Sequence, residues 1–385
     1  MTTAQKVVIW SFPTRILFGV GSAARTGEEA KRLGASRALI VTDKGVVKAG
    51  LSEPVERSLR EAGVEPVVFD DVLGNPIEKN VHDGVKAYRD AGADMIVALG
   101  GGSPLDVGKL VRLGVNHTRP LVDYDDATGG DQFITSNVPP MLALPTTAGT
   151  GSEVGRSGVV TLDVNHRKTV IFSPHLLANA AILDPELTRG LPPFFTAATG
   201  FDALTHCIEA LISKGDHPLA DGIATEGIRL VAESLERAVK DGNDLEARGN
   251  MMKAAMMGAV AFQKGLGACH SLAHPLSSEC NLHHGLANAL ALPAVLAFNA
   301  PEVGPKLARI STLLGGAPSA EGCIEAIRSL RDRIGITAGL GSAGVIRDKL
   351  DLLADLAFQD ACHQSNPRTC SRDDLRQLYE ASFAS

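Results

Sequence analysis

Four side chains in the second half of the sequence are spaced as ligands for a divalent metal. Asp202 and His206 stand four residues apart in a stretch with helical character, so both side chains point the same way. His270 and His284 lie in two later helical stretches of the same half. One carboxylate with three imidazoles suits iron, zinc, cobalt, nickel or manganese. The set contains no thiolate, which argues against a closed structural zinc site.

A glycine-rich turn in the first half is suited to phosphate. Residues 95–109, MIVALGGGSPLDVGK, begin as a buried apolar strand that ends at Gly100–Gly102. Ser103 is a good N-cap, and Pro104 suits the first position of the following helix. Glycines let the backbone approach a pyrophosphate, and the N–H groups of a helix start attract its charge. The alternative is a tight turn without a ligand, because the sequence is neither a Walker A motif nor a strict GxGxxG.

Two further polar features follow strands of the first half. Asp43 ends an apolar strand, where a carboxylate could bind an adenosine ribose and repel a 2′-phosphate, favouring NAD over NADP. The alternative is a helix-capping aspartate. This acid precedes the glycine turn, whereas the Rossmann fingerprint places it afterwards, so the topology is not the standard one. The run TTAGTGS at 146–152 could line a nicotinamide or ribose, or could simply open a hairpin.

The elements that must position these residues change character along the chain. The first half alternates strand and helix signals, which predicts a parallel sheet covered by helices. We expect strands at 37–43, 66–72, 94–100, 141–145 and 180–184, helices at 49–62 and 78–91, and a hairpin within 146–172. The second half predicts helices at 193–213, 218–240, 245–264, 267–279, 285–298, 303–314, 319–335 and 345–358. The expected domains are therefore an α/β domain over 1–192 and an all-helical domain over 193–385.

Composition excludes several classes of protein. The 385 residues are 44% hydrophobic, enough for a core in each of two domains. A net charge of −7 without a long basic run argues against nucleic acid as a partner. We see no signal peptide and no apolar stretch of the roughly 18 residues that a membrane span needs. The six cysteines form no CxxC pair, which fits reduced thiols in a cytoplasm.

Motifs from both halves resemble the iron-containing (group III) alcohol dehydrogenase family. The matching segments are ALGGGSPLDVGK (98–109), LPTTAGTGSEV (144–154), LDPELT (183–188), GFDALTHCIEAL (200–211), GLGACHSLAHPL (265–276), HGLANALALP (284–293) and DACHQSNPR (360–368). The resemblance covers nearly the whole chain, and the motifs are more specific together than singly. It implies a dehydroquinate synthase-like fold, with an α/β dinucleotide-binding domain, an all-α metal-binding domain and the active site between them.

The resemblance also implies roles by position. Asp202, His206, His270 and His284 match the four metal ligands, and His274 matches a histidine that faces the nicotinamide and is proposed in proton transfer. The implied NAD(H)-binding positions are Gly100, Gly101, Gly102, Ser103 and Asp106 around the pyrophosphate, Asp43 at the adenosine ribose with Asn75 nearby, Thr146 and Thr147 beside the nicotinamide, and Lys168 at a cofactor ribose.

We therefore expect reversible hydride transfer between NAD(H) and an alcohol–aldehyde pair. The metal, Fe²⁺ or Zn²⁺, would act as a Lewis acid on the substrate oxygen, and His274 would relay the proton. Members of the family are commonly homodimers or larger homo-oligomers. The alternatives are a glycerol or diol dehydrogenase, a reductase of a carboxylate-bearing semialdehyde of the 4-hydroxybutyrate type, a metal-free maleylacetate reductase-like enzyme, a cyclising synthase and a non-catalytic NAD or metal sensor. The complete ligand set counts against the metal-free enzyme.

The sequence departs from the commonest pattern of the family near the expected substrate. After the GSEV run the chain reads Gly155-Arg156-Ser157-Gly158, where many members have a Thr and an apolar or Asn residue. Gln263 and Lys264 stand where many members have Ser-Asn-Ala. These changes put simple short alkanols in doubt, because Arg156 and Lys264 could pair with an anionic substrate. The alternative is two solvent-facing cations. Cys362 would either line the substrate site or fill core space, and His363 beside it is equally ambiguous.

Overall fold

The computed structural model describes residues 14–164, 167–336 and 339–383. It divides into two compact units. The α/β unit contains the described residues up to Thr147 together with Gly151–Gly190, and the helical unit contains Ala148–Thr150 and the described residues from Leu191 onward. The sequence places the boundary at residue 192. It does not anticipate that three residues of the TTAGTGS run belong with the helical unit.

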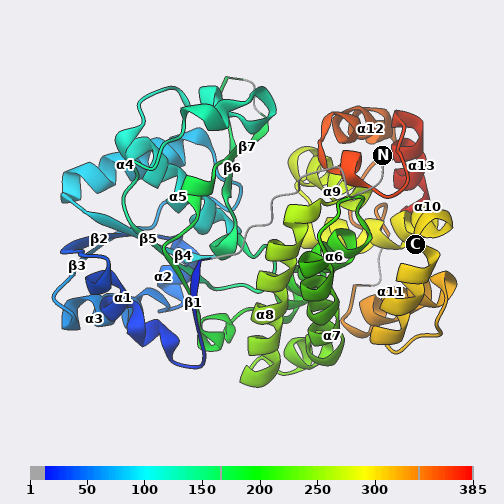
Figure 1. Ribbon diagram of the computed structural model, residues 1–385, viewed down its shortest axis with the longest axis horizontal. Coiled ribbons are helices and arrows are strands. Elements are labelled where there is room, and N and C mark those ends of the chain that lie inside the picture. Colours follow the sequence, from blue (N-terminus) through cyan, green and yellow to red (C-terminus); the bar gives the residue numbers. More distant parts are fainter. Residues whose placement is uncertain (1–13, 165–166, 337–338, 384–385) are drawn as a thin grey trace. The chain divides into compact units, whose positions relative to one another are not determined.

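Within the described residues, the α/β unit is built on a six-stranded parallel sheet (Figure 1). The strand order is β1-β8-β5-β4-β2-β3. Their bounds are β1 Arg15–Phe18, β2 Arg37–Val41, β3 Glu65–Phe69, β4 Met95–Gly100, β5 Met141–Pro145 and β8 Ala180–Leu183. Each neighbouring pair is parallel. β4, β5 and β8 are buried along their whole length, which is why their sequences are continuous apolar runs.

Helices cover both faces of this sheet, as alternate residues of one strand show. The helices of this unit are α1 Thr26–Arg32, α2 Lys44–Lys48, α3 Ser52–Glu61, α4 Glu78–Ala91 and α5 Gly102–Asn116. Leu39 and Val41 belong to the core beneath α4 and α5, whereas Ala38 and Ile40 belong to the core beneath α1 and α3. The expected hairpin is present as the antiparallel pair β6 Ser157–Thr161 and β7 Lys168–Phe172. The expected parallel sheet with helices on its faces is thus confirmed.

The helical unit packs its helices around a single apolar core (Figure 1). The helices are α6 Pro193–Ile212, α7 Pro218–Lys240, α8 Leu245–Ala261, α9 Ala268–Glu279, α10 His284–Leu313, α11 Ala320–Arg333, α12 Leu350–Gln359 and α13 Arg372–Ala381. α6 packs against α7, α8 and α10, and α10 also packs against α9 and α11. α6 and α10 therefore lie at the centre of the unit, where the candidate metal ligands are found.

The longest helical segment bears on two expectations. The sequence predicts separate helices at 285–298 and 303–314, and α10 contains both, divided by a kink at Val303, whose backbone dihedrals are not helical and which lies between Pro301 and Pro305. Among the described helices, α10 alone is long and apolar enough to cross a membrane, although the sequence was expected to contain no such stretch. Because 61% of its most apolar window is buried inside the unit, we interpret α10 as a core helix.

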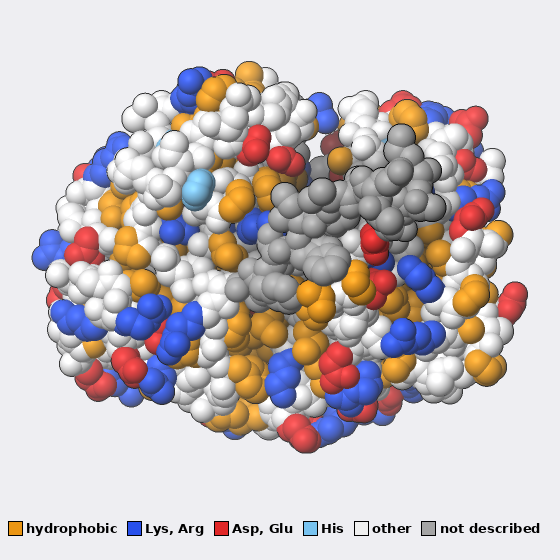
Figure 2. Space-filling model, in the orientation of Figure 1, with side chains coloured by type: hydrophobic (Ala, Val, Ile, Leu, Met, Phe, Trp, Pro, Cys, Tyr) orange, Lys and Arg blue, Asp and Glu red, His pale blue; other side chains and the backbone are white. Residues whose placement is uncertain are grey.

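Charge is mixed on the surface. On the face shown in Figure 2, acidic and basic side chains are interspersed. This distribution agrees with the modest net charge of −7. Nothing on that face resembles the continuous basic stripe that follows a nucleic-acid backbone.

Candidate functional site

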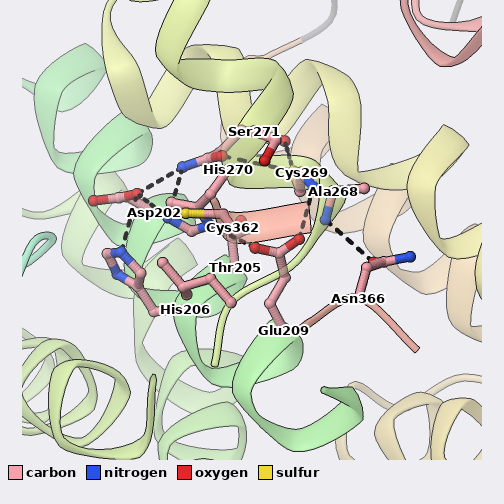
Figure 3. Close-up of polar contacts among 12 residues, drawn as sticks. Asp202, Thr205, His206, Glu209, Ala268, Cys269, His270, Ser271, Cys362 and Asn366 are labelled. Carbon is pink, nitrogen blue, oxygen red and sulfur yellow. Dashed lines mark hydrogen bonds and ion pairs between the residues drawn. The ribbon is translucent and has the colours of Figure 1, made fainter. Parts of the chain in front are cut away.

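The four candidate metal ligands come together inside the helical unit. α6 carries Asp202 and His206 on one face, α9 carries His270, and His284 is the first residue of α10. The first three are buried, and His284 is partly buried. Figure 3 shows the side chains of Asp202, His206 and His270 pointing toward one another.

Their spacing fits one divalent ion. Nε2 of His206 and Nε2 of His270 each lie 3.9 Å from Oδ1 of Asp202, and Nε2 of His284 lies 3.5 Å from the same oxygen. Two donors that each bind an ion at about 2.1 Å in a tetrahedral arrangement are about 3.4 Å apart. The ligand atoms of Asp202, His206 and His270 also lie within 4.8 Å of one another. Donors of this kind and spacing suit iron or zinc.

A close approach between two helices brings His284 to this site. At Gly285, a Cβ atom would stand 2.0 Å from the carbonyl oxygen of Ala198 on α6. No side chain could be accommodated there without moving one of the two helices. Glycine at this position therefore lets α10 begin directly against α6, which places its first residue beside Asp202.

Asn288 is a part of the site that the sequence did not single out. It is buried one turn after His284 on α10, and its Nδ2 donates to Oδ1 of Asp202 at 2.8 Å. The same nitrogen lies 3.3 Å from Nε2 of His284 and 3.5 Å from Nε2 of His270. An amide nitrogen only donates hydrogen bonds, so these contacts favour Nε2 atoms that carry a lone pair. That is the form in which imidazole binds a metal.

The charge states of the buried candidate ligands are set by competing effects. Burial opposes ionisation of Asp202, but the neighbouring histidines outweigh it and lower its pKa to about 2. Burial lowers the pKa of His206 to about 4, against the opposing charge of Asp202. The carboxylate is therefore charged, and this imidazole neutral, at physiological pH. Both are the forms that bind a divalent ion.

His274 lies one turn after His270 on α9, and its ring stacks on that of His284. The ring centroids are 5.3 Å apart with an interplanar angle of 15°. Nδ1 of His274 lies 2.7 Å from Oδ2 of Asp360, the first residue of the DACHQSNPR segment, for which the sequence alone indicates no role. Burial opposes ionisation of Asp360, but the charge and hydrogen bond of His274 hold the pKa of this carboxyl well below its usual range.

Cys362 lies beside the same pair. Its backbone N–H donates to Oδ1 of Asp360 at 2.8 Å, and the ligand atoms of His274, Asp360 and Cys362 lie within 4.8 Å of one another. Burial raises the pKa of the Cys362 thiol well above its usual range, so the sulfur is protonated. His363 points into the protein, where Nε2 lies 3.0 Å from the carbonyl oxygen of Phe358. The position of Cys362 suits a residue near the substrate, which stays a prediction.

Lys264 is not the solvent-facing cation that one of the two expectations described. It is buried in a short 3-10 turn after α8, Phe262–Lys264. Its ammonium pairs with Asp221 and donates to the carbonyl oxygen of Leu211 at 3.1 Å. A solvent-facing cation is therefore wrong for this residue. The existing carboxylate partner also removes the argument for pairing Lys264 with a substrate.

In the α/β unit, the glycine turn between β4 and α5 has the expected place but a different helix start. Gly100 has a φ of +152°, and a Cβ there would stand 2.5 Å from Cγ of Pro104, so glycine is required. α5 begins at Gly102, and Gly101 is its N-cap. Ser103 as the N-cap is therefore wrong, because its hydroxyl donates instead to the carbonyl oxygen of Gly74 at 2.7 Å. No side chain caps this helix start, which leaves it suited to a phosphate.

Asp106 lies one turn into α5 and is held from within the protein. Its carboxylate accepts from the hydroxyl of Ser152 at 2.5 Å and from the N–H of Val159 at 3.2 Å, and it pairs with buried Lys109 at 3.5 Å. Lys109 also donates to Ser152 at 2.6 Å and to the carbonyl of Ser157 at 2.7 Å. These contacts join α5 to the loop before β6. They favour a supporting role for Asp106 rather than direct contact with a pyrophosphate.

Asp43 is both a helix cap and part of a pocket. Its Oδ1 accepts from the N–H of Val46 at 2.9 Å and so caps α2. An open pocket of about 390 Å³ is lined by Asp43, Lys44, Gly45, Asp70, Asp71, Val72, Leu73 and Gly74. Asn75 follows directly and is exposed. Lys44 pairs with Asp71 at 2.7 Å, so carboxylates dominate this rim. The role of Asp43 and Asn75 at an adenosine ribose stays a prediction.

The remaining cofactor and substrate candidates gather near the glycine turn and the hairpin. The N–H of Thr146 donates to the carbonyl oxygen of Gly100 at 2.9 Å. Thr147 lies beside Gly101, because a Cβ atom built on Gly101 would stand 3.5 Å from Cγ2 of Thr147. Lys168 begins β7, and burial lowers the pKa of its ammonium. Ser157 begins β6 at the opposite side of the hairpin.

Arg156 is half-buried next to this hairpin. Its guanidinium carbon lies 5.2 Å from the ring centroid of Phe172, and burial lowers its pKa. Its carbonyl accepts from the N–H of Ser173 at 3.0 Å. Over the described residues, no carboxylate forms an ion pair with this guanidinium. Among the described residues, Arg156 therefore lacks the carboxylate partner that Lys264 has in Asp221.

Comparison with known proteins agrees with this geometry. Residues 13–185 match the family described as iron-containing alcohol dehydrogenase, and residues 196–383 match the Fe-containing alcohol dehydrogenase family, C-terminal. A 4-hydroxybutyrate dehydrogenase of Cupriavidus necator is 42% identical over 96% of this chain and 98% of its own length.

Solved structures are similar over the same extent. A 1,3-propanediol oxidoreductase has a TM-score of 0.95 at 38% identity, covering 98% of this chain and 100% of that one. A sulfoacetaldehyde reductase from Bifidobacterium kashiwanohense, solved in complex with NAD⁺, has a TM-score of 0.89 at 30% identity, covering 97% of this chain and 99% of that one. The expected dehydroquinate synthase-like fold is confirmed.

Proposed function

Since the chain belongs to the iron-containing alcohol dehydrogenase family and is an NAD-dependent oxidoreductase of alcohols and aldehydes, we propose that its substrate carries an anionic end. The substrate class would be a short ω-hydroxy acid and the corresponding semialdehyde. The observation that carries this proposal is the guanidinium of Arg156, which is half-buried and has no carboxylate partner among the described residues.

A partly buried cation is costly unless an anion accompanies it. Arginine is the side chain best suited to a carboxylate, because its planar guanidinium can donate two parallel hydrogen bonds. The neighbouring ring of Phe172 holds one face of the group, as aromatic rings commonly do for arginine. A substrate carboxylate at Arg156 would therefore complete an interaction that the described chain leaves open.

Two relatives have names that point the same way. The relative at 42% identity is named for 4-hydroxybutyrate, which carries a carboxylate, and a solved relative is named for sulfoacetaldehyde, which carries a sulfonate. A neutral diol is the second candidate, because another solved relative is a 1,3-propanediol oxidoreductase. Arg156 favours the anionic class, since a neutral diol would leave the guanidinium without a counter-charge.

The residues of the helical unit would divide the chemistry as follows. A divalent ion held by Asp202, His206, His270 and His284 would supply Lewis-acid polarisation of the substrate oxygen, and NAD(H) would supply the hydride chemistry. His274 would exchange the proton of the substrate oxygen at Nε2, because its Nδ1 is engaged by Asp360. Asp360 would hold the imidazole in that orientation.

The test compares paired aldehydes that differ only in charge. Protein purified without oxygen and loaded with Fe²⁺ is assayed for NADH oxidation with succinate semialdehyde and with butanal, and a chelator serves as the metal control. We expect chelator-sensitive turnover with a clear preference for the semialdehyde. Arg156→Gln should raise KM for the semialdehyde by about 10–100-fold, the worth of a hydrogen bond between charged groups, and leave butanal unchanged.

Arg119→Gln is the matched control. Its guanidinium also rests on a phenylalanine, at 4.0 Å from the Phe133 ring, but it is exposed and lies near Asp123. We expect no change in substrate preference. A wild-type preference for butanal would instead assign the enzyme to neutral alcohols, and equal loss with both aldehydes in Arg156→Gln would mean that Arg156 acts only on the local structure.

We also propose a cytoplasmic homodimer or larger homo-oligomer. All six cysteines are free, as reduced thiols would be in a cytoplasm. The oligomeric part rests on the family alone. Light scattering on the purified protein measures it directly, and a monomer at micromolar concentration would exclude it.

A further inference from the structure

We propose that Glu209 is a positioning residue for the metal centre, which fixes the orientation and tautomer of His270. It lies on α6, one turn beyond His206, and is buried. Its Oε2 lies 2.6 Å from Nδ1 of His270, at the ring edge opposite to the one that faces Asp202. The proposal rests on the four-ligand assignment and is independent of the choice of substrate.

Donor and acceptor chemistry decides where the proton of His270 lies. A carboxylate only accepts hydrogen bonds, so Nδ1 carries the hydrogen in its contact with Glu209. In the neutral ring, Nε2 then keeps its lone pair. It faces Oδ1 of Asp202 at 3.9 Å and the donating amide nitrogen of Asn288 at 3.5 Å. Contacts on both edges of the ring therefore favour the same tautomer, the one in which Nε2 can bind a metal.

The second oxygen of Glu209 holds the helix that carries this ligand. Oε1 accepts from the N–H of Cys269 at 2.7 Å, in the first turn of α9. The neighbouring N–H of Ala268 donates to Oδ1 of Asn366 at 3.1 Å, and the N-cap residue itself supplies no side-chain bond. Figure 3 shows Glu209 and Asn366 meeting this helix start from two different segments. Glu209 thus fixes both the ring of His270 and the backbone next to it.

Charge gives Glu209 a second effect on the centre. A buried carboxylate is costly unless it has charged or hydrogen-bonding partners. Together with Asp202, Glu209 brings two negative charges to a site suited to a dication, one as a ligand and one behind a ligand. A bound divalent ion is commonly the largest local charge in its site. We therefore expect Glu209 to favour metal binding electrostatically as well as geometrically.

Glu209→Gln tests the tautomer directly. Glutamine keeps the length of the side chain and can still accept from Cys269, but its amide nitrogen would then face Nδ1 as a donor. That arrangement places the His270 proton on Nε2, where a metal must bind. We expect the affinity for Fe²⁺ and Zn²⁺, measured by competition with a chelator of known affinity, to fall by about 10–100-fold.

Two companion variants separate positioning from folding. Asn366→Ala removes the other cap of α9 without touching His270, so it should keep the wild-type metal affinity. Glu209→Asp keeps an accepting carboxylate and should therefore recover part of the metal affinity that Glu209→Gln loses. Circular dichroism and thermal unfolding of the metal-free proteins check that each variant folds.

The outcomes are distinct. Unchanged metal affinity in folded Glu209→Gln would overturn the proposal, as would an equal loss in Asn366→Ala. If Glu209→Gln does not fold, weaker metal binding by folded Glu209→Asp than by Asn366→Ala supports the proposal, and equal binding overturns it. A wild-type protein that binds neither ion would instead overturn the ligand assignment. A preference for neutral substrates would affect only the proposed function, because metal affinity is measured without substrate.

Discussion

Oδ2 of Asp360 lies 2.7 Å from Nδ1 of His274, so a carboxylate from the C-terminal part of the chain holds the histidine next to the candidate metal ligands. The other oxygen of Asp360 accepts from the hydroxyl of Ser271 at 2.7 Å and from the N–H of Cys362 at 2.8 Å. Asp360 is thus fixed from several sides. Because it can only accept, it leaves Nε2 of His274 as the nitrogen that could exchange a proton.

This arrangement predicts different losses for the two members of the pair. His274→Ala should lower kcat by about 10²–10⁴-fold if the imidazole relays the proton. Asp360→Asn should lower kcat by about 10–100-fold, because an amide nitrogen at Nδ1 would favour the wrong tautomer. Metal content and KM for NADH should stay near the wild-type values in both variants. Steady-state kinetics together with metal analysis provide the measurement.

Ser271→Ala is the control for Asp360. It removes a hydrogen bond to the same carboxylate without touching His274, so kcat should change by no more than a few fold. A wild-type kcat in His274→Ala would exclude the relay. An equally large loss in Ser271→Ala would mean that Asp360 acts only on the local structure.

Loss of a metal ligand should remove metal and activity together, with different costs to stability. His270→Ala and His284→Ala each remove one imidazole from Asp202. His270→Ala also leaves Glu209 buried beside a cavity, which should destabilise the metal-free protein by about 3–5 kcal/mol. His284 has a side chain that is 29% exposed, so its removal should cost much less. Metal content by atomic absorption and thermal unfolding test both statements, and full activity in either variant would refute the ligand assignment.

Asp43 should decide between NAD and NADP. Asp43→Ser removes the charge but keeps a side chain that can cap α2, so folding should be preserved. Since a carboxylate repels a 2′-phosphate, KM for NADPH should fall by about tenfold, whereas NADH should bind more weakly. Asp70→Asn, which changes another acid of the same pocket, shows how much of the effect is general charge. Unaltered cofactor preference in Asp43→Ser would leave Asp43 with its capping role alone.

Part of the candidate metal site has a signal in the local sequence, whereas the residues around it have none. Asp202 and His206 share a helix face by spacing alone. Glu209 meets His270 across 61 residues, and Asp360 meets His274 across 86. In the sequence, Glu209 reads as one more polar residue of a helix. Only its contacts with Cys269 and His270 at the start of α9 distinguish it, so its role could not be inferred from spacing.

The fold shows the same division between local and distant causes. β4 and β5 were predictable because both are continuous apolar runs bounded by turn residues. β1, Arg15–Phe18, was missed because its short mixed sequence is stabilised by pairing with β8, far along the chain. Lys264 was misplaced for a related reason, since its partner Asp221 lies 43 residues away. The hydropathy pattern of a segment indicates its preferred secondary structure and burial. It does not indicate which distant strand will pair with it or which distant carboxylate will pair with one of its cations.

Glu153 lies in the short 3-10 turn Ser152–Val154 at the end of the TTAGTGS run, and its burial predicts how the stability of the protein depends on pH. Burial raises its pKa from 4.5 to about 7, with the charge of Lys109 only partly opposing. Between these values the folded protein holds a proton that the unfolded chain has lost, so stability should fall as pH rises from 4.5 to 7 and then level off. The full cost is about 3 kcal/mol.

Glu153→Gln removes that titration, because the amide stays neutral at every pH. We expect the variant to unfold at a higher temperature than the wild type at pH 8, and the difference to shrink toward zero near pH 5. Thermal unfolding across this range measures it, at about 2–4 °C per kcal/mol for a unit of this size. Glu65→Gln, at an exposed acid of the same unit, should leave the wild-type profile unchanged. Parallel pH profiles for wild type and Glu153→Gln would mean that Glu153 is ionised throughout, with Lys109 compensating for its burial.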